Sequence, residues 1–379
     1  MQTFLSYAKS RKEEIIRAIG EMVKCESPSD SPADVNRYVD LLVEHARDIA
    51  APKLIKSDRY GKHLRLDFKV PGRPREAQIL GVGHSDTVWP LGTLRMMPYR
   101  RQKGRLWGPG VLDMKSGIAF FIYAVRALRD LEIPVRRKIA LLVVSDEEVG
   151  SKNSRQLTET EAKRSSCVLV LEPGSAMTGK LKTARKGIAG YKLVVQGKAA
   201  HAGIDFPTGA SAIVELARQI ERIAGFTDLA LGTTVNPGII SGGTRTNVIA
   251  AEARVDIDVR VPNAKDAAAI DRKMHSLRPF DKRCKLAVEG GLNRPPMERT
   301  KAVADLFTRA KRIGAEMGME LDESSTGGGS DGNFTAALGV PTLDGLGGVG
   351  EGAHAINESI LIDRIADRTA LLAGLLSRL

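Results

Sequence analysis

Lys138-Ile-Ala-Leu-Leu-Val-Val144 is a near-continuous apolar run, and the polar stretch Ser-Asp-Glu-Glu follows it directly at residues 145–148. A short apolar run without alternation predicts a strand that is buried on both faces, as in a parallel sheet covered by helices. In open α/β sheets, ligands bind at the carboxyl ends of the strands. The run therefore predicts an α/β fold, and it makes Asp146, Glu147 and Glu148 candidate functional residues.

Helical and strand patterns alternate around this run. The periodicity predicts amphipathic helices over residues 4–23 and 33–50, a half-exposed strand over 64–70 and a short apolar strand over 77–83. A strongly apolar helix over 117–131 and a second buried strand over 168–171 complete the pattern. This alternation favours a sheet with helices on its faces.

The pattern changes after about residue 178. Strands are predicted over residues 190–196, 233–240, 251–261 and 285–289, with helices over 211–223 and 264–277. This order is typical of a compact, ferredoxin-like α+β unit. We therefore expect a discontinuous larger domain of residues 1–178 and 290–379, with residues 179–289 inserted into it.

Composition excludes several classes of function. Aromatic residues make up 4% of the 379 residues, which argues against stacking on nucleic acid. The formal net charge of +12 has two readings, a solvated basic surface or steering of anionic substrates. A basic stretch precedes the apolar helix, and the same two readings apply to it: Arg95, Arg100, Arg101, Lys103 and Arg105.

The spacing of the cysteines and the hydropathy pattern indicate the cellular compartment of the protein. Cys25, Cys167 and Cys284 are far apart and form no CxxC pair, which argues against a disulfide framework and against a cysteine zinc site. The first residues contain no apolar signal core, and no apolar run approaches the length of a membrane span. We expect a cytoplasmic protein without membrane association.

Four further segments carry a histidine or a carboxylate at a predicted strand end or in a glycine-rich turn. His84 follows the apolar strand of residues 77–83, and Asp86, two residues on, shares its face. Asp113 lies in a glycine-rich turn before the apolar helix, Glu172 ends the strand of residues 168–171, and His354 lies in a glycine-rich loop. Two histidines with three carboxylates could hold two zinc ions that share one carboxylate.

Each segment also has an alternative reading. A lone His-x-Asp is more often a satisfied surface histidine, and Asp113 suits the N-cap of a helix. The three acids at residues 146–148 could form a solvated loop. Three adjacent carboxylates after so apolar a strand would repel each other without a cation, which favours a metal site.

Together the motifs resemble those of the M20 metallopeptidases, the group of the glutamate carboxypeptidases, aminoacylases and succinyl-diaminopimelate desuccinylase. The likeness covers nearly the whole chain, and Leu-Glu-Pro with Gly-Gly-Gly-Ser-Asp-Gly looks closest to the glutamate carboxypeptidase (carboxypeptidase G2-like) branch. The matching stretches are Gly-His-Ser-Asp-Thr-Val (83–88), Gly-Pro-Gly-Val-Leu-Asp-Met-Lys-Ser-Gly (108–117), Ser-Asp-Glu-Glu-Val-Gly (145–150), Leu-Glu-Pro (171–173), Gly-Lys-Ala-Ala-His-Ala-Gly (197–203) and Gly-Gly-Gly-Ser-Asp-Gly-Asn (327–333).

The resemblance implies a dizinc centre, in which Co²⁺ or Mn²⁺ could replace Zn²⁺. Asp113 would bridge the two ions, His84 and Glu172 would complete one, and Glu148 and His354 would complete the other. It also implies that Glu147 is the general base and that Asp86 orients His84.

The resemblance further implies a homodimer formed through the inserted domain. His201 would then reach the active site of the partner subunit and stabilise the tetrahedral intermediate, while Asn247 and Arg260 would bind the carboxylate end of the substrate. The implied activity is that of a metallo-carboxypeptidase acting on peptides or N-acyl amino acids and releasing glutamate or a similar residue. An aminoacylase-like amidohydrolase or a dipeptidase of the same fold remains open, as does a non-catalytic binding protein on a degenerate hydrolase scaffold.

Overall fold

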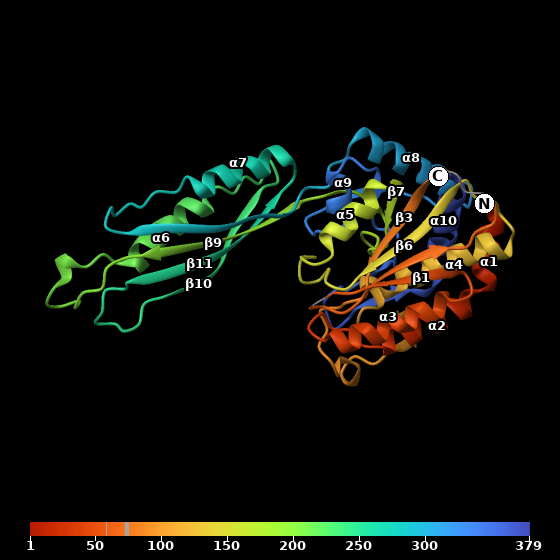
Figure 1. Cartoon of the computed structure of the whole chain (residues 1–379), viewed down its shortest axis with the longest axis horizontal. Coiled ribbons are helices and arrows are strands. Elements are labelled where there is room, and N and C mark those ends of the chain that lie inside the picture. The colour runs from red at the N-terminus through yellow and green to blue at the C-terminus, as the bar shows by residue number, and fades with distance from the viewer. Residues whose placement is uncertain (58, 73–75) are drawn as a thin grey trace. The chain divides into compact units, whose positions relative to one another are not determined.

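The computed structural model describes residues 1–57, 59–72 and 76–379. The chain folds into two compact units (Figure 1): unit 1 contains residues 1–184, 299–326 and 330–379, and unit 2 contains residues 185–298 and 327–329. These boundaries differ from the expected 178/179 and 289/290. The reason is that β8 (Leu181–Arg185) pairs with β13 (Glu323–Thr326), while β12 (Lys285–Arg294) continues beyond residue 289.

The core of unit 1 is a mixed, six-stranded sheet in the order β1-β2-β6-β3-β7-β14. Strands β3, β6, β7 and β14 are parallel to one another. At one edge of the sheet, β2 pairs antiparallel with β6, and β1 pairs antiparallel with β2. The predicted mixed sheet is thus confirmed. The strand bounds are β1 (Ala50–Ile55), β2 (His63–Phe68), β3 (Glu76–His84), β6 (Arg137–Val144), β7 (Ser165–Val170) and β14 (Thr342–Leu343).

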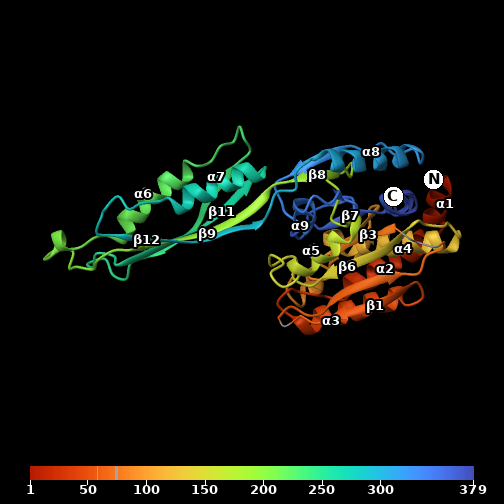
Figure 2. The same ribbon diagram turned by 45° about the horizontal axis from the view of Figure 1, so that its top comes forward.

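Helices cover both faces of this sheet, so β6 is buried on both sides as predicted. Ile139, Leu141 and Val143 belong to the larger apolar core, and the alternate residues of the strand belong to a smaller core on the other face. Figure 2 shows helices on either side of the sheet. The helices of unit 1 are α1 (Gln2–Ser10), α2 (Lys12–Lys24), α3 (Pro32–Ala46), α4 (Ser116–Asp130), α5 (Arg155–Lys163), α8 (Lys301–Ala315), α9 (Gly332–Ala337) and α10 (Ile365–Arg378).

A small antiparallel sheet in unit 1 carries the loop of His354. Its order is β15-β16-β5-β4, and the loop joins β15 to β16. The strands are β4 (Arg100–Gln102), β5 (Arg105–Trp107), β15 (Gly350–Glu351) and β16 (Ser359–Leu361). Because β16 pairs with β5, the segment from His354 to Glu358 lies beside the chain that leads to Asp113.

Unit 2 is a four-stranded antiparallel sheet with two helices, in the chain order βαββαβ. The strand order β10-β11-β9-β12 is that of the predicted ferredoxin-like arrangement. Alternate residues of β9 and β11 form its core with α6 and α7. The bounds are β9 (Gly187–Gln196), α6 (Ala212–Ala224), β10 (Thr234–Gly242), β11 (Glu252–Val261), α7 (Ala264–His275) and β12 (Lys285–Arg294).

Two predicted helices differ from the structure. The single helix expected over residues 4–23 is two helices, α1 and α2, that meet at Arg11. The helix expected over residues 33–50 ends at Ala46, and Ala50 begins β1. In the described part of the chain, no helix combines the length and apolar character that crossing a membrane requires.

Candidate metal centre

The structure brings the five predicted metal ligands together at the carboxyl ends of the parallel strands. His84 is the last residue of β3, and Glu148 and Glu172 follow β6 and β7. Since β3 lies between β6 and β7, the three segments emerge side by side. Asp113 precedes α4, and His354 comes from the loop between β15 and β16.

Two groups of three ligand atoms share the Asp113 carboxylate, and within each group the atoms lie no more than 4.8 Å apart. His84 Nε2 lies 3.2 Å from Asp113 Oδ1 and 3.7 Å from Glu172 Oε1. His354 Nε2 lies 3.4 Å from Asp113 Oδ2 and 3.2 Å from Glu148 Oε2. Ligands of a tetrahedral Zn²⁺ ion are about 3.3 Å apart, given bonds of about 2.0–2.1 Å. The donor set therefore fits a divalent cation on each side of Asp113.

The pKa values of both histidines and of Glu148 in this cluster are raised. For the histidines, burial acts against the neighbouring carboxylates. Burial acts to lower the pKa of His84, but its contacts with Asp113 and Asp86 outweigh burial and raise it well above the usual value. Hydrogen bonds to Asp113 and Glu148 raise the pKa of His354 to about 10. The pKa of Glu148 is raised, chiefly by burial. Acids and imidazoles thus compete for protons at this point, and cations bound to neutral imidazoles would replace those protons.

Asp86 contacts His84 chiefly through its main chain. His84 Nδ1 lies 2.9 Å from the Asp86 main-chain oxygen and 3.5 Å from Oδ1 of its carboxylate. The Asp86 carboxylate also accepts hydrogen bonds from the backbone amides of Glu147 and Glu148, each at 3.2 Å, and from the Ser29 hydroxyl at 2.8 Å. Asp86 is 1% exposed, so this buried acid fixes the turn that carries the candidate base and one candidate ligand.

Glu358, which sequence reasoning missed, holds the loop of Asp113. Its carboxylate accepts the backbone amides of Gly110, Leu112 and Asp113 at 3.0, 2.8 and 3.1 Å, and the indole N–H of Trp89 at 2.8 Å. The Glu358 side chain is fully buried, and burial raises its pKa to about 6. The N-cap reading of Asp113 is not supported, because the N-cap residue of α4 is Lys115. In the sequence, Glu358 is visible only as an acid four residues after His354. The groups that donate hydrogen bonds to it lie far away in the chain, so the sequence does not reveal its role.

Glu147, the candidate base, follows β6 at the same edge of the sheet as the five candidate ligands. It is partly exposed, as a group that exchanges protons with a substrate must be. Its backbone amide is bound to the Asp86 carboxylate, so its position depends on that acid. Asp146 instead points into the protein, where its carboxylate accepts the amide of Asn153 at 2.8 Å.

The predicted substrate residues lie in unit 2, at different ends of β11. Asn247 and His201 lie close together: the Asn247 carbonyl accepts the amide of Ala202, next to His201. His201 is exposed, and its Nδ1 accepts the amides of Gly203 and Ile204 at 3.1 and 3.2 Å. In the neutral ring the proton then resides on Nε2, which is left as a donor.

Arg260 lies near the far end of β11. Its guanidinium group is paired with Asp258 through two contacts of 2.9 and 3.0 Å. The eight steps between consecutive residues from Glu252 to Arg260 span about 26 Å at the rise of a strand. The structure therefore does not bring Arg260 together with His201 and Asn247 inside one subunit.

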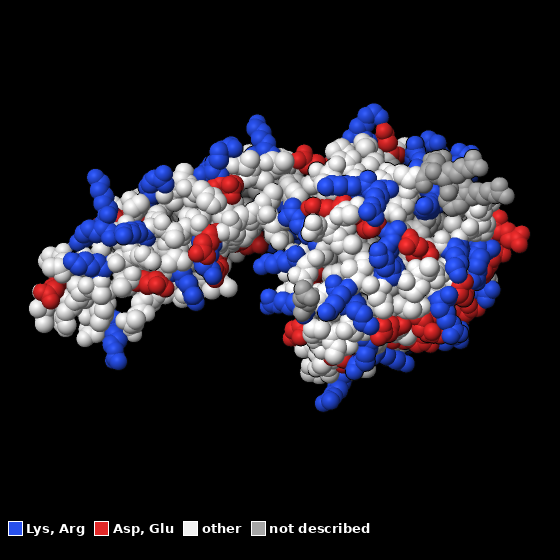
Figure 3. All heavy atoms as spheres, viewed as in Figure 1, with Lys and Arg blue, Asp and Glu red and all other residues white. Residues whose placement is uncertain are grey.

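Three of the five basic residues before Asp113 form ion pairs or a cation–π contact. Arg101 pairs with Glu13, Arg105 pairs with Glu351, and the Arg100 guanidinium lies 4.9 Å from the centre of the Trp107 ring. Figure 3 shows lysine and arginine side chains spread over the visible face of the molecule with acidic side chains among them. On that face, this distribution favours the reading of a solvated basic surface.

The chain is similar in sequence to known peptidases. The profile described as "Peptidase family M20/M25/M40" matches residues 81–378. Carboxypeptidase G2 of Pseudomonas sp. strain RS-16 is 32% identical over 314 residues, which are 81% of this chain and 75% of that protein.

Solved structures share the fold. Aminopeptidase PepT from Bacillus cereus superimposes with a TM-score of 0.79 at 23% identity, covering 97% of this chain and 98% of that one. The YXEP protein of Bacillus subtilis, described as a dinuclear metal-binding peptidase of the M20 family, has a TM-score of 0.71 at 13% identity and covers 97% and 98% of the two chains.

Proposed function

Because the chain belongs to peptidase family M20/M25/M40, a family of metal-dependent hydrolases, we propose that it is a dizinc enzyme that cuts an amide bond next to a free carboxylate. The preferred reaction is release of glutamate, or a similar amino acid, from a small peptide or N-acyl amino acid. The name of the relative carboxypeptidase G2 supports cleavage at a C-terminal residue. The observation that carries the proposal is the pair of ligand groups that share Asp113.

The donor set suits two Zn²⁺ ions in each subunit, with Co²⁺ or Mn²⁺ as substitutes. His84, Asp113 and Glu172 would hold one ion, and Asp113, Glu148 and His354 the other. When bound, such ions lower the pKa of a coordinated water and polarise the substrate carbonyl. The buried supports of Asp113 and His84 would keep the ligands in place during turnover.

Glu147 would act as the general acid and base. It would take a proton from the attacking water and deliver it to the nitrogen of the leaving amine. The amide hydrogen bond to Asp86 would keep Glu147 at the sheet edge beside the ligands while its carboxylate remains accessible to substrate. His201 would donate from Nε2 to the oxyanion, a contact whose loss commonly costs about 3 kcal/mol.

His201 and Arg260 would serve one substrate only if they came from different subunits. About 26 Å of β11 separates the ends of unit 2 at which they lie, which is longer than a small N-acyl amino acid. A homodimer removes this difficulty: Arg260 of one subunit would bind the substrate carboxylate, and His201 of the other would reach the carbonyl. Asn247, which the resemblance assigns to the carboxylate end together with Arg260, lies beside His201 and would therefore come from the same subunit as His201.

The surface of unit 2 supports such a dimer. Strand β10 is an edge strand of its sheet, and α6 exposes apolar side chains, which is typical of a surface that another chain covers. The exposed apolar residues are Ile213 and Val214 of α6 and Ile239 and Ile240 of β10, with exposed fractions of 45, 53, 67 and 60%.

Two experiments test the proposal. A zinc-loaded enzyme should hydrolyse N-acyl glutamates faster than N-acyl aliphatic amino acids or dipeptides; the reverse order would support the aminoacylase or dipeptidase alternative. Metal analysis well below one ion per chain, without turnover of any of these substrates, would support the non-catalytic alternative.

The shared site is tested by mixing two variants. His201→Ala and Arg260→Ala should each be nearly inactive, and random exchange of their subunits should restore about a quarter of wild-type activity. Restoration would require a dimer, which analytical ultracentrifugation detects directly. A monomer with full activity would overturn the two-subunit site while leaving the metal centre untouched.

A further inference from the structure

Arg368, near the start of α10, is a fully buried arginine of unit 1, with 0% of its surface exposed. Within residues 1–57, 59–72 and 76–379 it forms no ion pair, and its neighbour Asp367 pairs with Arg364. Burial lowers the pKa of Arg368 to about 9, so its side chain is still charged at neutral pH. Burying a cation without a carboxylate costs free energy unless hydrogen bonds satisfy its donors.

All three nitrogens of the Arg368 guanidinium group donate to main-chain carbonyl groups. Nε donates to Gly347 at 3.0 Å, Nη1 to Gly179 at 3.0 Å, and Nη2 to Gly345. Residues 345–349 are buried but lie outside helices and strands, so their carbonyl groups need partners from elsewhere in the protein. The planar guanidinium group supplies such partners to two separate stretches of the chain at once.

Gly347 connects Arg368 to the candidate ligand Glu172. The carbonyl of Gly347 accepts from Arg368, and its amide donates to the main-chain oxygen of Glu172 at 2.8 Å. A Cβ atom at position 347 would lie 2.1 Å from the carbonyl oxygen of the residue before Glu172, so this close approach requires glycine. The amide of Gly174 donates to the carbonyl of Gly348 at 2.9 Å. The segment 345–349 therefore packs against the backbone just before and just after Glu172.

The same segment leads to His354, a candidate ligand of the other proposed ion. Residue 349 precedes β15, and His354 follows the end of β15 by three residues. The carbonyl of Val349 accepts the amide of Leu361 at 2.8 Å, which extends the pairing of β15 with β16. One stretch of backbone, bound by Arg368, thus contacts Glu172 and continues into the strand before His354.

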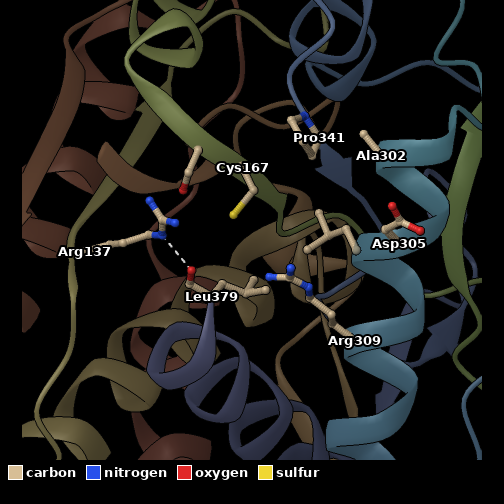
Figure 4. Close-up of a pocket in the computed structure, with 9 residues that line it drawn as sticks. Arg137, Cys167, Ala302, Asp305, Arg309, Pro341 and Leu379 are labelled. Carbon is tan, nitrogen blue, oxygen red and sulfur yellow. Dashed lines mark hydrogen bonds between the residues drawn. The ribbon is translucent and has the colours of Figure 1, made fainter. Parts of the chain in front are cut away.

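The direction of α10 places Arg368 at the metal end of the sheet. The other end of this helix reaches the start of β6, where Arg137 donates to the main-chain oxygen of Leu379 at 2.6 Å (Figure 4). The helical rise from residue 368 to residue 379 is about 16 Å. Arg368 therefore lies towards the carboxyl ends of β6 and β7, where Glu148 and Glu172 emerge.

We propose that Arg368 is a positioning residue of the candidate metal centre, which holds Glu172 and the chain before His354 in place for the two ions. This inference rests on the proposed dizinc function. Arg368 acts through the backbone of Gly345 and Gly347 rather than on a ligand side chain. Its loss would leave buried carbonyl groups without donors, and the segment between them would move.

Competition with a chromophoric chelator at pH 7.5 measures the Zn²⁺ affinity of variants that circular dichroism shows to be folded. Arg368→Lys keeps the charge, but a single ammonium group cannot replace a fork that reaches three carbonyl groups. We expect this variant to bind both ions at least tenfold more weakly. With Co²⁺ its visible absorption spectrum should also change, because that spectrum reports the coordination geometry.

Arg65→Lys is the matched control. Arg65 also forms several hydrogen bonds within unit 1, but its partners include Gln78 near the start of β3, at the opposite end of the sheet. This control should bind Zn²⁺ within twofold of the wild type. Equal weakening in both variants would indicate a general loss of stability and would overturn the inference.

The remaining outcomes separate this inference from the proposed function. If the wild type binds two ions and a folded Arg368→Lys protein binds them equally well, only the role of Arg368 is wrong. A wild type that binds no metal would overturn both. If Arg368→Lys does not fold, hydrogen exchange of the wild type decides. Loading with Zn²⁺ should slow exchange of the amides of residues 345–349 at least tenfold more than it slows that of β2, and equal exchange with and without metal would overturn the inference.

Discussion

Replacing Glu358 with glutamine is expected to release the loop that carries Asp113. Each oxygen of this carboxylate accepts two hydrogen bonds: Oε1 from the amides of Leu112 and Asp113, and Oε2 from the amide of Gly110 and the indole of Trp89. Glutamine keeps one acceptor oxygen and turns an NH₂ group toward the other two donors. Asp113 would then lose its fixed position between His84 and His354.

The magnitude follows from the bonds lost. A hydrogen bond to a charged group contributes about 1.5–3 kcal/mol, so losing two of the four costs about 3–6 kcal/mol of unfolding free energy. Solvent screening gives no discount, because Glu358 is 0% exposed. At pH 7.5 the wild-type carboxyl is ionised, since its pKa is about 6.

Urea unfolding at pH 7.5, followed by tryptophan fluorescence, measures this loss. Trp89 and Trp107 are the two tryptophans of the chain, and both lie in unit 1, so the signal reports on the unit that contains Glu358. Metal content after dialysis should also fall. Glu351→Gln is the control, because Glu351 is half-exposed in its pair with Arg105 and should cost no more than about 1 kcal/mol. A Glu358→Gln protein as stable and as metal-rich as this control would refute the reasoning.

Three further outcomes are expected. Glu147→Gln should retain its metal while kcat falls about 10²–10⁴-fold, because an amide cannot transfer the proton; metal analysis with kinetics checks this, and full turnover would place the base elsewhere. Burial lowers the pKa of His63 below its ordinary 6.5, against the field of Asp146. The unfolded chain therefore takes up that proton first, and stability should fall as the pH drops below about 6.5, less so in His63→Gln when urea unfolding is compared at pH 7.5 and 5.5. Cys167 and Cys284 are 5 and 3% exposed and burial raises both pKa values, so rapid native-state labelling by a disulfide reagent at pH 7.5 would contradict the structure.

The central strands were predictable because their burial leaves a simple pattern. In β6, alternate residues face two different apolar cores, and a strand with two buried faces has little room for polar residues. The strands of unit 2 were predictable for the converse reason. Only one face of β9 and β11 is buried, so apolar and polar residues alternate along them.

The break between α1 and α2 was not predictable from local sequence. Arg11, where the chain turns, is neither glycine nor proline, and the apolar periodicity continues through it. Both helices contact α4 and α10, but α1 packs mainly on α10, whereas α2 also contacts α3 and the segment Val111–Lys115 before α4. Tertiary packing therefore sets this turn, and it overrides the helical preference of the segment.

The candidate ligands were predictable one by one, since each follows a strand or lies in a glycine-rich turn. Their supports were not, because hydrogen bonds between distant residues define them. Glu358 is 245 positions from Asp113, whose amide it accepts, and Ser29 is 57 positions from Asp86. An isolated acid or serine in a loop carries no pattern that reveals such a partner.

The order of the strands brings ligands that are far apart in the chain to one centre. This order is also the feature of the site that is hardest to predict from the sequence. With β3 between β6 and β7, His84 emerges beside the turns of both Glu148 and Glu172. Neighbouring strands are about 4.8 Å apart, so one additional strand between β3 and β7 would move Glu172 by about that distance. The 3.7 Å contact between His84 and Glu172 would then be lost, and with it the ligand group of His84, Asp113 and Glu172. The same adjacency lets the Asp86 carboxylate reach the amides of Glu147 and Glu148 across the β3–β6 boundary. Sheet topology thus positions one candidate ligand, the candidate base and their common support by a single arrangement of backbone.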